Sequence, residues 1–399
     1  MSLKAREAVA VTVLVALTVI GALGVLQMHT KPLMPVEPFE SAEGMPWRSL
    51  VAVYVFLVVS TTGLCIIAAI GSLGYTKLEP ILKELVLMAI VTIVVGLVAI
   101  AMDVEQVPRA HYAFLGHVNV SSAMFWMIMF YTVYFLFLIV EAWLLFYEDL
   151  AKLRESGGIR GAIARILTVP KVSGSIEFER VASFFAVSVG CISTSNLGAL
   201  FALNYLPLWH DAMTPVYMLL TAIVSGASIG VIGVTLADWL RGRKIEGERY
   251  EALQTLRFIL GFALVVAALF TGWRYIVKAY PNSALLSRES YEAFLAVFGF
   301  NFWFFEVFIG MLLPLIMLAT PQIGRKTAGV FFASLLALIG MFVSRFDFVL
   351  GGQLVKLITG LSLEAAYHPF EVIATTGFLA LSVLLYYVLY KLLPVEVEA

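Results

Sequence analysis

Five histidines are the side chains of this sequence that could exchange protons near neutral pH, and their positions share one property. All five lie at or beyond the ends of long apolar stretches: His29, His111, His117, His210 and His368. A haem held by two histidines needs them on facing helices inside an apolar bundle, so this distribution argues against that cofactor. The sequence therefore places its polar chemistry at one face of whatever the apolar stretches build.

Charged side chains within the apolar stretches are a second set of candidates, because a charge inside a membrane is costly and is kept mainly where it has a function. Glu141 lies in the inner half of one stretch and Glu306 near the middle of another, and we interpret both as candidates for proton transfer. Arg345, Asp347 and Glu371 lie at the ends of stretches, where a structural role is the simpler interpretation. Arg345 and Asp347 are spaced for a local ion pair.

A third set of polar and aromatic residues lies where the apolar stretches should end on the outer side. A quinone requires hydrogen-bond donors for its carbonyl oxygens, a group that exchanges protons, and apolar walls. Tyrosine, histidine, a carboxylate and tryptophan at the end of an apolar bundle meet these requirements, although each of them alone is more often an interfacial anchor or a loop residue. The candidate quinone-binding residues are Tyr54, Asp103, His117, Trp126 and His210.

Membrane-spanning helices are the elements expected to position these residues. The 399-residue chain is 61% hydrophobic and 13% charged, whereas a soluble domain is about a quarter charged, and its net charge of −1 does not indicate nucleic-acid binding. A span needs about 20 apolar residues, and its backbone in lipid must be helical. We predict an all-α integral membrane protein with about ten transmembrane helices. The expected spans are roughly 8–28, 49–73, 80–102, 121–146, 181–203, 213–239, 257–277, 295–319, 327–344 and 370–392.

Most of the 26 lysines and arginines fall on the side that holds both termini when the chain crosses ten times. By the positive-inside rule that side is cytoplasmic. The sequence therefore predicts a multi-pass protein of a prokaryotic cytoplasmic membrane, with both termini in the cytoplasm and the quinone site toward the outer face. The two cysteines, Cys65 and Cys191, lie in separate apolar stretches and cannot supply the four thiolates that an iron–sulfur cluster usually needs.

A faint internal repeat divides the chain. Tyr54 is followed nine residues later by Gly63, and Tyr217 is followed at the same interval by Gly226. Both stretches run inward from the outer side, so a duplicated four-helix unit is expected. Within one membrane domain at 1–399 we predict an extra N-terminal span and outer loop at 8–48, a first four-helix bundle at 49–203, a second at 204–344, and an outer loop with the C-terminal span at 345–399.

Several strings in the sequence are distinctive. LWHDAMTPVY at 208–217 is followed by Ser225-Gly226-Ala227. The others are NVSSAMFW at 119–126, FEVFIG at 305–310 followed by Pro314-Leu315, YHPFE at 367–371 and LPV at 393–395. Together these strings resemble the NrfD-like family, the membrane subunits of polysulfide reductases and of certain periplasm-facing nickel–iron hydrogenases, in its ten-span branch.

The resemblance implies a quinone-reactive membrane anchor. Such anchors bind menaquinone or a related quinone near the outer face and exchange its electrons with a ferredoxin-like iron–sulfur subunit, which connects to a nickel–iron or molybdopterin catalytic subunit. The chain itself would then carry neither haem nor an iron–sulfur cluster. In some relatives a histidine on the first core helix contacts the quinone, and Tyr54 occupies that place here. The proton acceptor is then expected to be Asp103 or His210.

Two other functions stay open from the sequence alone. A ten-span secondary transporter would bind its solute at the midplane with helices broken by glycine or proline, and Pro314 is the main interior proline here. A haem-bearing cytochrome b is the other. The sequence does not identify the terminal substrate of the complex or the direction of electron flow.

Overall fold

The structure of the chain is a computed structural model, and it describes residues 3–30, 47–103, 111–112, 118–169, 175–204, 206–280, 285–353 and 369–395. The described residues contain helices and no strand. Ten helical segments are long and apolar enough to cross a membrane, which confirms the predicted all-α class and the number of spans.

The helices follow one another along the chain. Three segments, α9, η4 and α10, form one continuous span, of which η4 is a π-helix. The elements are α1 (Leu3–Thr30), α2 (Ser49–Ser72), η1 (Thr76–Ile81), α3 (Leu82–Asp103), α4 (Ala123–Lys152), η3 (Leu153–Glu155), α5 (Gly158–Leu167), α6 (Ser175–Ala202), α7 (Thr214–Arg241), α8 (Gly247–Ala279), α9 (Leu285–Phe300), η4 (Asn301–Leu312), α10 (Leu313–Ala319), α11 (Pro321–Gly324), α12 (Thr327–Gly351) and α14 (Pro369–Leu392).

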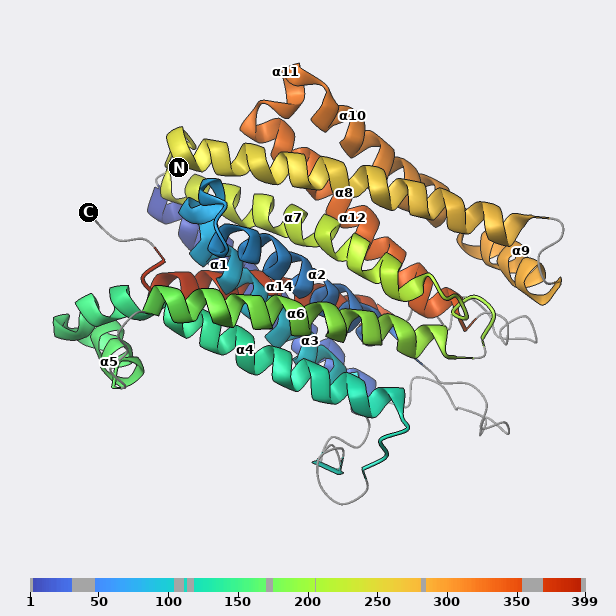
Figure 1. Cartoon of the computed structure of the whole chain (residues 1–399), viewed down its shortest axis with the longest axis horizontal. Coiled ribbons are helices and arrows are strands. Elements are labelled where there is room, and N and C mark those ends of the chain that lie inside the picture. Colours follow the sequence, from blue (N-terminus) through green and yellow to red (C-terminus); the bar gives the residue numbers. More distant parts are fainter. Residues whose placement is uncertain are drawn as a thin grey trace.

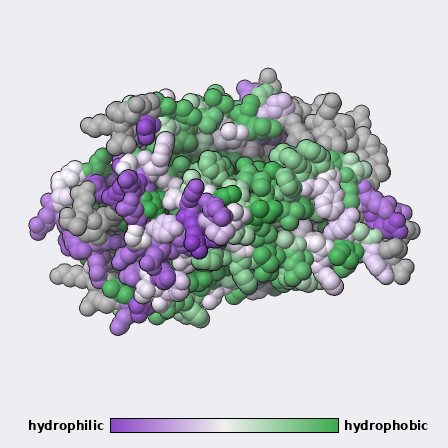
Figure 2. All heavy atoms as spheres, turned by 90° about the horizontal axis from the view of Figure 1, so that it is seen from above, coloured by the Kyte–Doolittle hydropathy of each residue, from purple (hydrophilic) through white to green (hydrophobic). Residues whose placement is uncertain are grey.

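The two ends of the helix assembly differ in character. Both described chain ends lie at the same end, on the left in Figure 1, which we call the terminal side; the opposite end is the far side. Hydrophobic residues form a broad band between the two ends, and hydrophilic residues gather most densely at the terminal side (Figure 2). A membrane protein shows this distribution because lipid surrounds its middle and water its ends.

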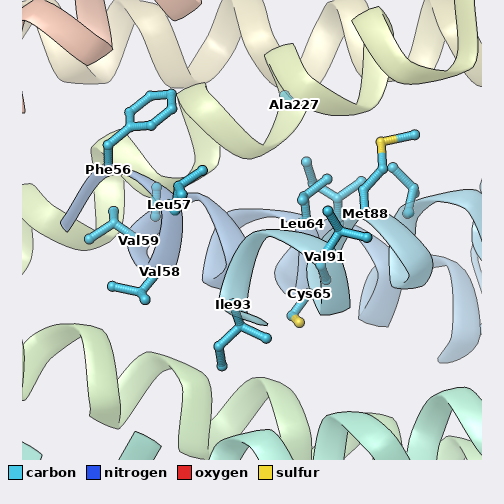
Figure 3. Packing of buried hydrophobic residues seen from close by; sticks show 14 of the residues in the cluster. Phe56, Leu57, Val58, Val59, Leu64, Cys65, Met88, Val91, Ile93 and Ala227 are labelled. Carbon is cyan, nitrogen blue, oxygen red and sulfur yellow. The ribbon is translucent and has the colours of Figure 1, made fainter. Parts of the chain in front are cut away.

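Helix α2 is the centre of the molecule. It packs against α3, α6, α7, α12 and α14, and nearly all of its residues are buried. Its sequence is apolar on every face, as expected of a helix that is surrounded by others. Figure 3 shows its side chains, among them Leu57, Leu64 and Cys65, packed between neighbouring helices. The site residues described below are therefore held by a closely packed core.

Most of the helices, including α2, contact one another in two groups. The first group is α2, α3, α4 and α6, and the second is α7, α8, η4 with α10, and α12. Contacts of α2 with α7, of α6 with α7 and of α2 with α12 join the two groups to each other. The division into two separate four-helix bundles therefore stays a prediction. Helices α1 and α14 pack against each other beside these groups.

Two glycines bring the groups together. A Cβ added to Gly226 would lie 2.4 Å from the carbonyl carbon of Gly63, and one added to Gly63 would lie 1.8 Å from the carbonyl oxygen of Ala222. The backbones of α2 and α7 therefore touch at the two glycines of the sequence repeat. Tyr54 and Tyr217, nine residues before each glycine, both lie toward the far side.

The ninth span is longer than the sequence analysis predicted. Helix α12 continues beyond residue 344 to Gly351, since Phe346, Phe348 and Val349 supply further apolar contacts. Arg345 and Asp347 are therefore interior residues of a helix, and the local ion pair predicted between them is not formed. Each has a partner on another helix instead.

Candidate functional site

A cavity opens at the far side of the second group of helices. Its volume is about 90 Å³. Its walls come from α7, α8, α9, η4 and α12, and aromatic side chains make up much of them. The charged residues that line it are Arg274, Lys278, Glu306, Arg345 and Asp347, and Tyr217, Thr271 and Ser344 are among the lining residues that carry hydroxyl groups.

The floor of the cavity is a cluster of buried ionisable groups. Glu306, Arg345 and Asp347 are only 5%, 3% and 1% exposed. Arg345 donates a short hydrogen bond to the Thr221 hydroxyl on α7, and the Asn301 amide donates to Asp347 Oδ1 at 3.2 Å. The Glu306 and Asp347 carboxyl groups face each other within hydrogen-bonding reach. Buried charges need such partners, so the floor is held in one arrangement.

A close helix contact positions the two carboxyl groups. A Cβ added to Gly310 of η4 would lie 2.6 Å from the Cα of Gly340 on α12, so the two backbones touch there. Glu306 lies four residues before Gly310, and Asp347 lies seven residues after Gly340 on the antiparallel helix. The π-helical turn that carries Glu306 is a rare conformation that is frequent at functional sites.

The mouth of the cavity carries a second ionic cluster. Arg274 Nε donates to Asp211 Oδ2 at 2.8 Å, and the Lys278 ammonium lies 3.9 Å from the same oxygen. The Arg274 guanidinium also lies over the Tyr217 ring, 4.6 Å from its centroid. Burial raises the pKa of Asp211, but Arg274, the Met213 N–H and Lys278 together hold this pKa below its usual range. Asp211 is therefore an anion that orients Arg274 toward the cavity.

The loop before α7 places Asp211 at the mouth. Trp209 is fully buried, stacks on Trp47 with ring centroids 5.1 Å apart, and donates from Nε1 to the Phe348 carbonyl at 2.7 Å. A Cβ on Gly352 would lie 1.6 Å from Trp209 Nε1, so only glycine allows the loop to close over the end of α12.

In the first group, side chains fill the place beside Tyr54 that corresponds to the cavity beside Tyr217. Tyr54 is 4% exposed, its hydroxyl lies 3.7 Å from the Met127 sulfur, and its ring packs against Tyr131 at 6.3 Å between centroids. Farther toward the terminal side, the Thr62 and Thr194 hydroxyls are hydrogen-bonded at 2.7 Å. The matching tyrosines of the repeat thus have different surroundings, one packed against sulfur and rings and the other at a charged cavity.

Polar groups continue from Tyr54 toward the terminal side of the first group. The Tyr134 hydroxyl donates to Cys65 Sγ at 2.9 Å. Glu141 is 1% exposed, and Ser183 and Glu179 are its polar neighbours. The Ser72 hydroxyl donates to Glu179 Oε1 at 2.7 Å. These residues form an interrupted polar series through an otherwise apolar group of helices.

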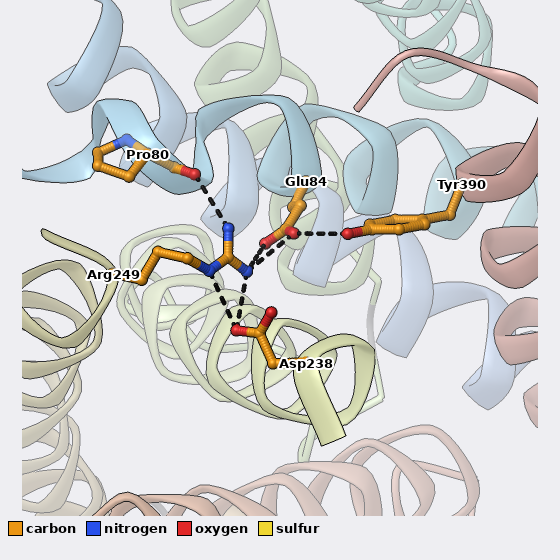
Figure 4. A network of polar contacts seen from close by, with 5 residues as sticks. All are labelled: Pro80, Glu84, Asp238, Arg249 and Tyr390. Carbon is orange, nitrogen blue, oxygen red and sulfur yellow. Dashed lines mark hydrogen bonds and ion pairs between the residues drawn. The ribbon is translucent and has the colours of Figure 1, made fainter. Parts of the chain in front are cut away.

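A separate ionic network lies at the terminal side and is shown in Figure 4. The Arg249 guanidinium donates to Glu84 at 3.0 and 3.2 Å, to Asp238 at 3.0 Å and to the Pro80 carbonyl at 3.2 Å. The Tyr390 hydroxyl donates to Glu84 at 3.1 Å. Four helices and η1 meet at one arginine, so we interpret this network as structural.

No group of three or more His, Cys, Asp or Glu that could hold a metal ion occurs among the described residues. Comparison with known proteins then identifies the relatives of the chain. The family model described as "Polysulphide reductase, NrfD" matches residues 38–357. The chain belongs to the NrfD family.

Two relatives match the chain over almost its full length, and a third matches it over 79%. A selenate reductase subunit of Mesobacillus selenatarsenatis is 22% identical over 95% of this chain and 93% of that protein. The Hdr-like menaquinol oxidoreductase integral membrane subunit of Archaeoglobus fulgidus is 23% identical over 96% and 93%. The probable Ni/Fe-hydrogenase 2 b-type cytochrome subunit of Escherichia coli is 25% identical over 79% and 74%. The NrfD-like resemblance drawn from the motifs is therefore confirmed.

The structure places the predicted quinone-binding residues of this NrfD-family chain in different surroundings. Tyr54 is buried, whereas Asp103 is half-buried at the far-side end of α3. Trp126 is 42% exposed on α4 and donates from Nε1 to the Val120 carbonyl at 2.8 Å. His210 is exposed, and its Nδ1 lies 3.2 Å from the Asn204 carbonyl. His117 lies outside the described residues. All four described residues lie toward the far side, and their role in quinone binding stays a prediction.

Sequence reasoning missed most residues of the cavity. In the NrfD motif at 208–217 it selected His210, whereas Asp211 is the residue that holds Arg274. Arg274 and Lys278 lie four residues apart at the end of an apolar span, so they share one helix face, and this spacing was an available signal. No local signal indicated that this face would meet Glu306 and Asp347.

Proposed function

We propose that this NrfD-family protein exchanges electrons between a membrane quinone and an iron–sulfur subunit of a respiratory oxidoreductase complex. The observation that carries the proposal is the near full-length similarity to a protein named as the integral membrane subunit of a menaquinol oxidoreductase. The polar and aromatic side chains near the far-side ends of the spanning helices, Tyr54, Asp103, Trp126 and His210, support it.

The quinone ring is placed at the far-side end of the first group. Tyr54 would hold one ring oxygen, Trp126 and His117 would border the pocket, and Asp103 or His210 would exchange protons. Binding would require the Tyr54 hydroxyl to leave the Met127 sulfur, which is a weak acceptor. A quinone carbonyl is the stronger acceptor, so this exchange favours the bound ring.

Oxidation of a quinol releases two electrons and two protons, and the described residues offer acceptors for the protons. The electrons would pass to a ferredoxin-like subunit joined to a nickel–iron or molybdopterin catalytic subunit, and no haem or cluster would be held on this chain. Glu141 and Glu306 are candidates for carrying protons inward, since both are buried carboxyl groups of spanning helices. The protein would lie in a prokaryotic cytoplasmic membrane with its termini in the cytoplasm.

The test compares two activities of the purified complex. Tyr54→Phe, Asp103→Asn and His210→Gln should each lower quinol-linked turnover about tenfold or more, since each removes a hydrogen bond or a proton acceptor in the transition state. Dye-linked activity of the catalytic partner should be unchanged. Tyr75→Phe, the same change at an exposed tyrosine on the terminal side, is the matched control. Full quinol activity in all three variants would reject this placement of the ring.

A ten-span secondary transporter is the alternative function. Co-purification of a subunit with iron–sulfur absorbance supports the anchor, whereas a solitary protein that accumulates a solute in vesicles supports the transporter. A reduced-minus-oxidised spectrum of the same preparation tests the proposed absence of haem, because a b-type haem would give its own absorption bands.

A further inference from the structure

The cavity of the second group combines flat aromatic walls with a charged floor. Tyr275 of α8 and Phe302 of η4 are stacked, with ring centroids 6.3 Å apart and planes 15° from parallel. Tyr291 and Phe294 of α9 are stacked at 5.9 Å and 17°. Such walls suit a planar ligand, and a few fixed polar groups beside them would orient it.

The aromatic walls are a separate part of the apolar interior. Tyr291, Phe294 and Phe302 belong to a small cluster with Leu208 and Leu350 that is distinct from the main core around α2. Helix α9 contributes Tyr291, Phe294 and Phe298 to this cluster.

One carboxylate oxygen on the floor has no hydrogen-bond donor. Asp347 lines the cavity and is 1% exposed, and its Oδ2 is buried without a partner. Three cations also line the cavity, Arg345 at the floor and Arg274 and Lys278 at the mouth. A ligand that offers both hydroxyl donors and carbonyl acceptors would satisfy the carboxyl groups and the cations together.

The cavity is separated from the lipid-facing surface by a single aromatic layer. Trp303 is 48% exposed on η4, and its ring contacts both Tyr275 at 5.1 Å and Phe302 at 4.9 Å. Phe300 and Phe304 are exposed on the same continuous span. A ligand with an apolar tail could keep that tail in lipid while its ring passed this layer. The surroundings of Tyr54 differ, because Met127 and Tyr131 fill the equivalent place there.

We propose that the cavity binds the ring of a second quinone, apart from the place proposed near Tyr54. The Tyr217 hydroxyl, Arg274 and Arg345 face the ring oxygens, and Phe294 and Phe302 lie along its faces. The identity of the ligand as a quinone rests on the proposed function, whereas the site itself rests on the cavity.

The test uses the intact complex and a short-chain azido-naphthoquinone as the probe. After photolysis, peptide mass spectrometry should find labels in the segments 271–278 and 291–303 as well as in the first group. Tyr217→Phe should weaken binding at the cavity about fivefold, the effect of one lost hydrogen bond. Ser344→Leu, which fills part of the cavity, should remove the cavity label and leave one bound naphthoquinone per chain instead of two.

Tyr280→Phe is the matched control for Tyr217→Phe, because Tyr280 is 59% exposed at the end of α8 and lies outside the cavity. If Ser344→Leu prevents assembly, Tyr217→Phe carries the test. Labels confined to the first group, with binding unchanged in both cavity variants, would overturn the proposal. Normal quinol turnover with no cavity label would reject the second site alone, whereas a cavity label without quinol turnover in the unaltered complex would reject the proposed function alone.

Discussion

Asp211 shows how one residue can prepare a site without lining it. Its carboxylate accepts from Arg274, lies near Lys278, and also accepts from the Met213 N–H at 2.9 Å. The side chains of Asp211 and Arg274 are each 16% exposed. The pair is therefore screened less by solvent than an exposed ion pair and contributes more to stability. We interpret Asp211 as a positioning residue, because it fixes the direction of a cation that faces the cavity.

Replacing Asp211 by asparagine should lower stability in a pH-dependent way. The pKa of Asp211 in the folded protein is below its usual value of about 3.9, so its stabilising effect is fully present above that pH and is lost as pH falls through the folded pKa. Asp211→Asn should cost about 1–3 kcal/mol at pH 7, and the difference should disappear at the acidic end. Thermal unfolding in detergent across pH measures this.

The control for Asp211 is Glu292→Gln. Glu292 pairs with Arg288 at 2.8 Å, but its side chain is 61% exposed, so its removal should change the melting temperature little. Equal effects of the two changes, or an Asp211 effect that does not vary with pH, would contradict the assigned role.

At the scale of elements, the molecule is organised by places where helix backbones touch. Gly63 meets Gly226, Gly310 meets Gly340, and Gly21 of α1 meets Gly377 of α14. Lipid is as apolar as leucine, so helices in a membrane associate through close packing, which small residues allow. The first contact joins the two groups of helices, and the second sets the positions of Glu306 and Asp347.

Replacing Gly226 by alanine should therefore separate α2 from α7. The added Cβ would lie 2.4 Å from the backbone of Gly63, where no side-chain movement can relieve the clash, and we expect a loss of about 3 kcal/mol or more. Gly272→Ala on α8 is the control, since its Cβ would meet no atom within 4 Å. It should be neutral or slightly stabilising. Thermal melting curves of the two variants test this prediction. Equal melting temperatures for Gly226→Ala and Gly272→Ala would refute the close contact between α2 and α7.

At the scale of the whole molecule, the far side and the terminal side carry different groups of polar residues. The far side holds the cavity and the predicted quinone residues, and the terminal side holds the Arg249 network that joins α3, α7, α8 and α14. Glu84 and Asp238 are each 1% exposed, and one arginine partners both of them. Losing one partner of a buried ion group is strongly destabilising, so the terminal side acts as a fixed base for the far side.

The predicted orientation can be tested with reporter fusions. The basic residues concentrate on the terminal side, so a fluorescent protein fused after Val395 should fluoresce, and alkaline phosphatase fused there should be inactive. Alkaline phosphatase fused after Ala279, at the far-side end of α8, should be active. The reverse pattern would place the quinone site on the cytoplasmic side and overturn the predicted topology.

The sequence by itself determined the class of the protein, the number of spans and the family. Each of these properties is encoded in contiguous stretches of the sequence. A lipid-facing helix must be apolar over its own length, and the residues of a family motif follow one another along the chain. It also indicated the repeat, since Tyr54 and Tyr217 keep the same interval from Gly63 and Gly226.

Only the tertiary structure decided which of these tyrosines lies at a cavity. The surroundings of Tyr54 and Tyr217 are made by residues far away in the chain, Met127 and Tyr131 for one and Arg274 for the other. An apolar helix carries little periodic signal of which face meets which neighbour, because lipid and protein interior are equally apolar. Pairings between distant helices, and any site built from them, are therefore properties of the packed molecule.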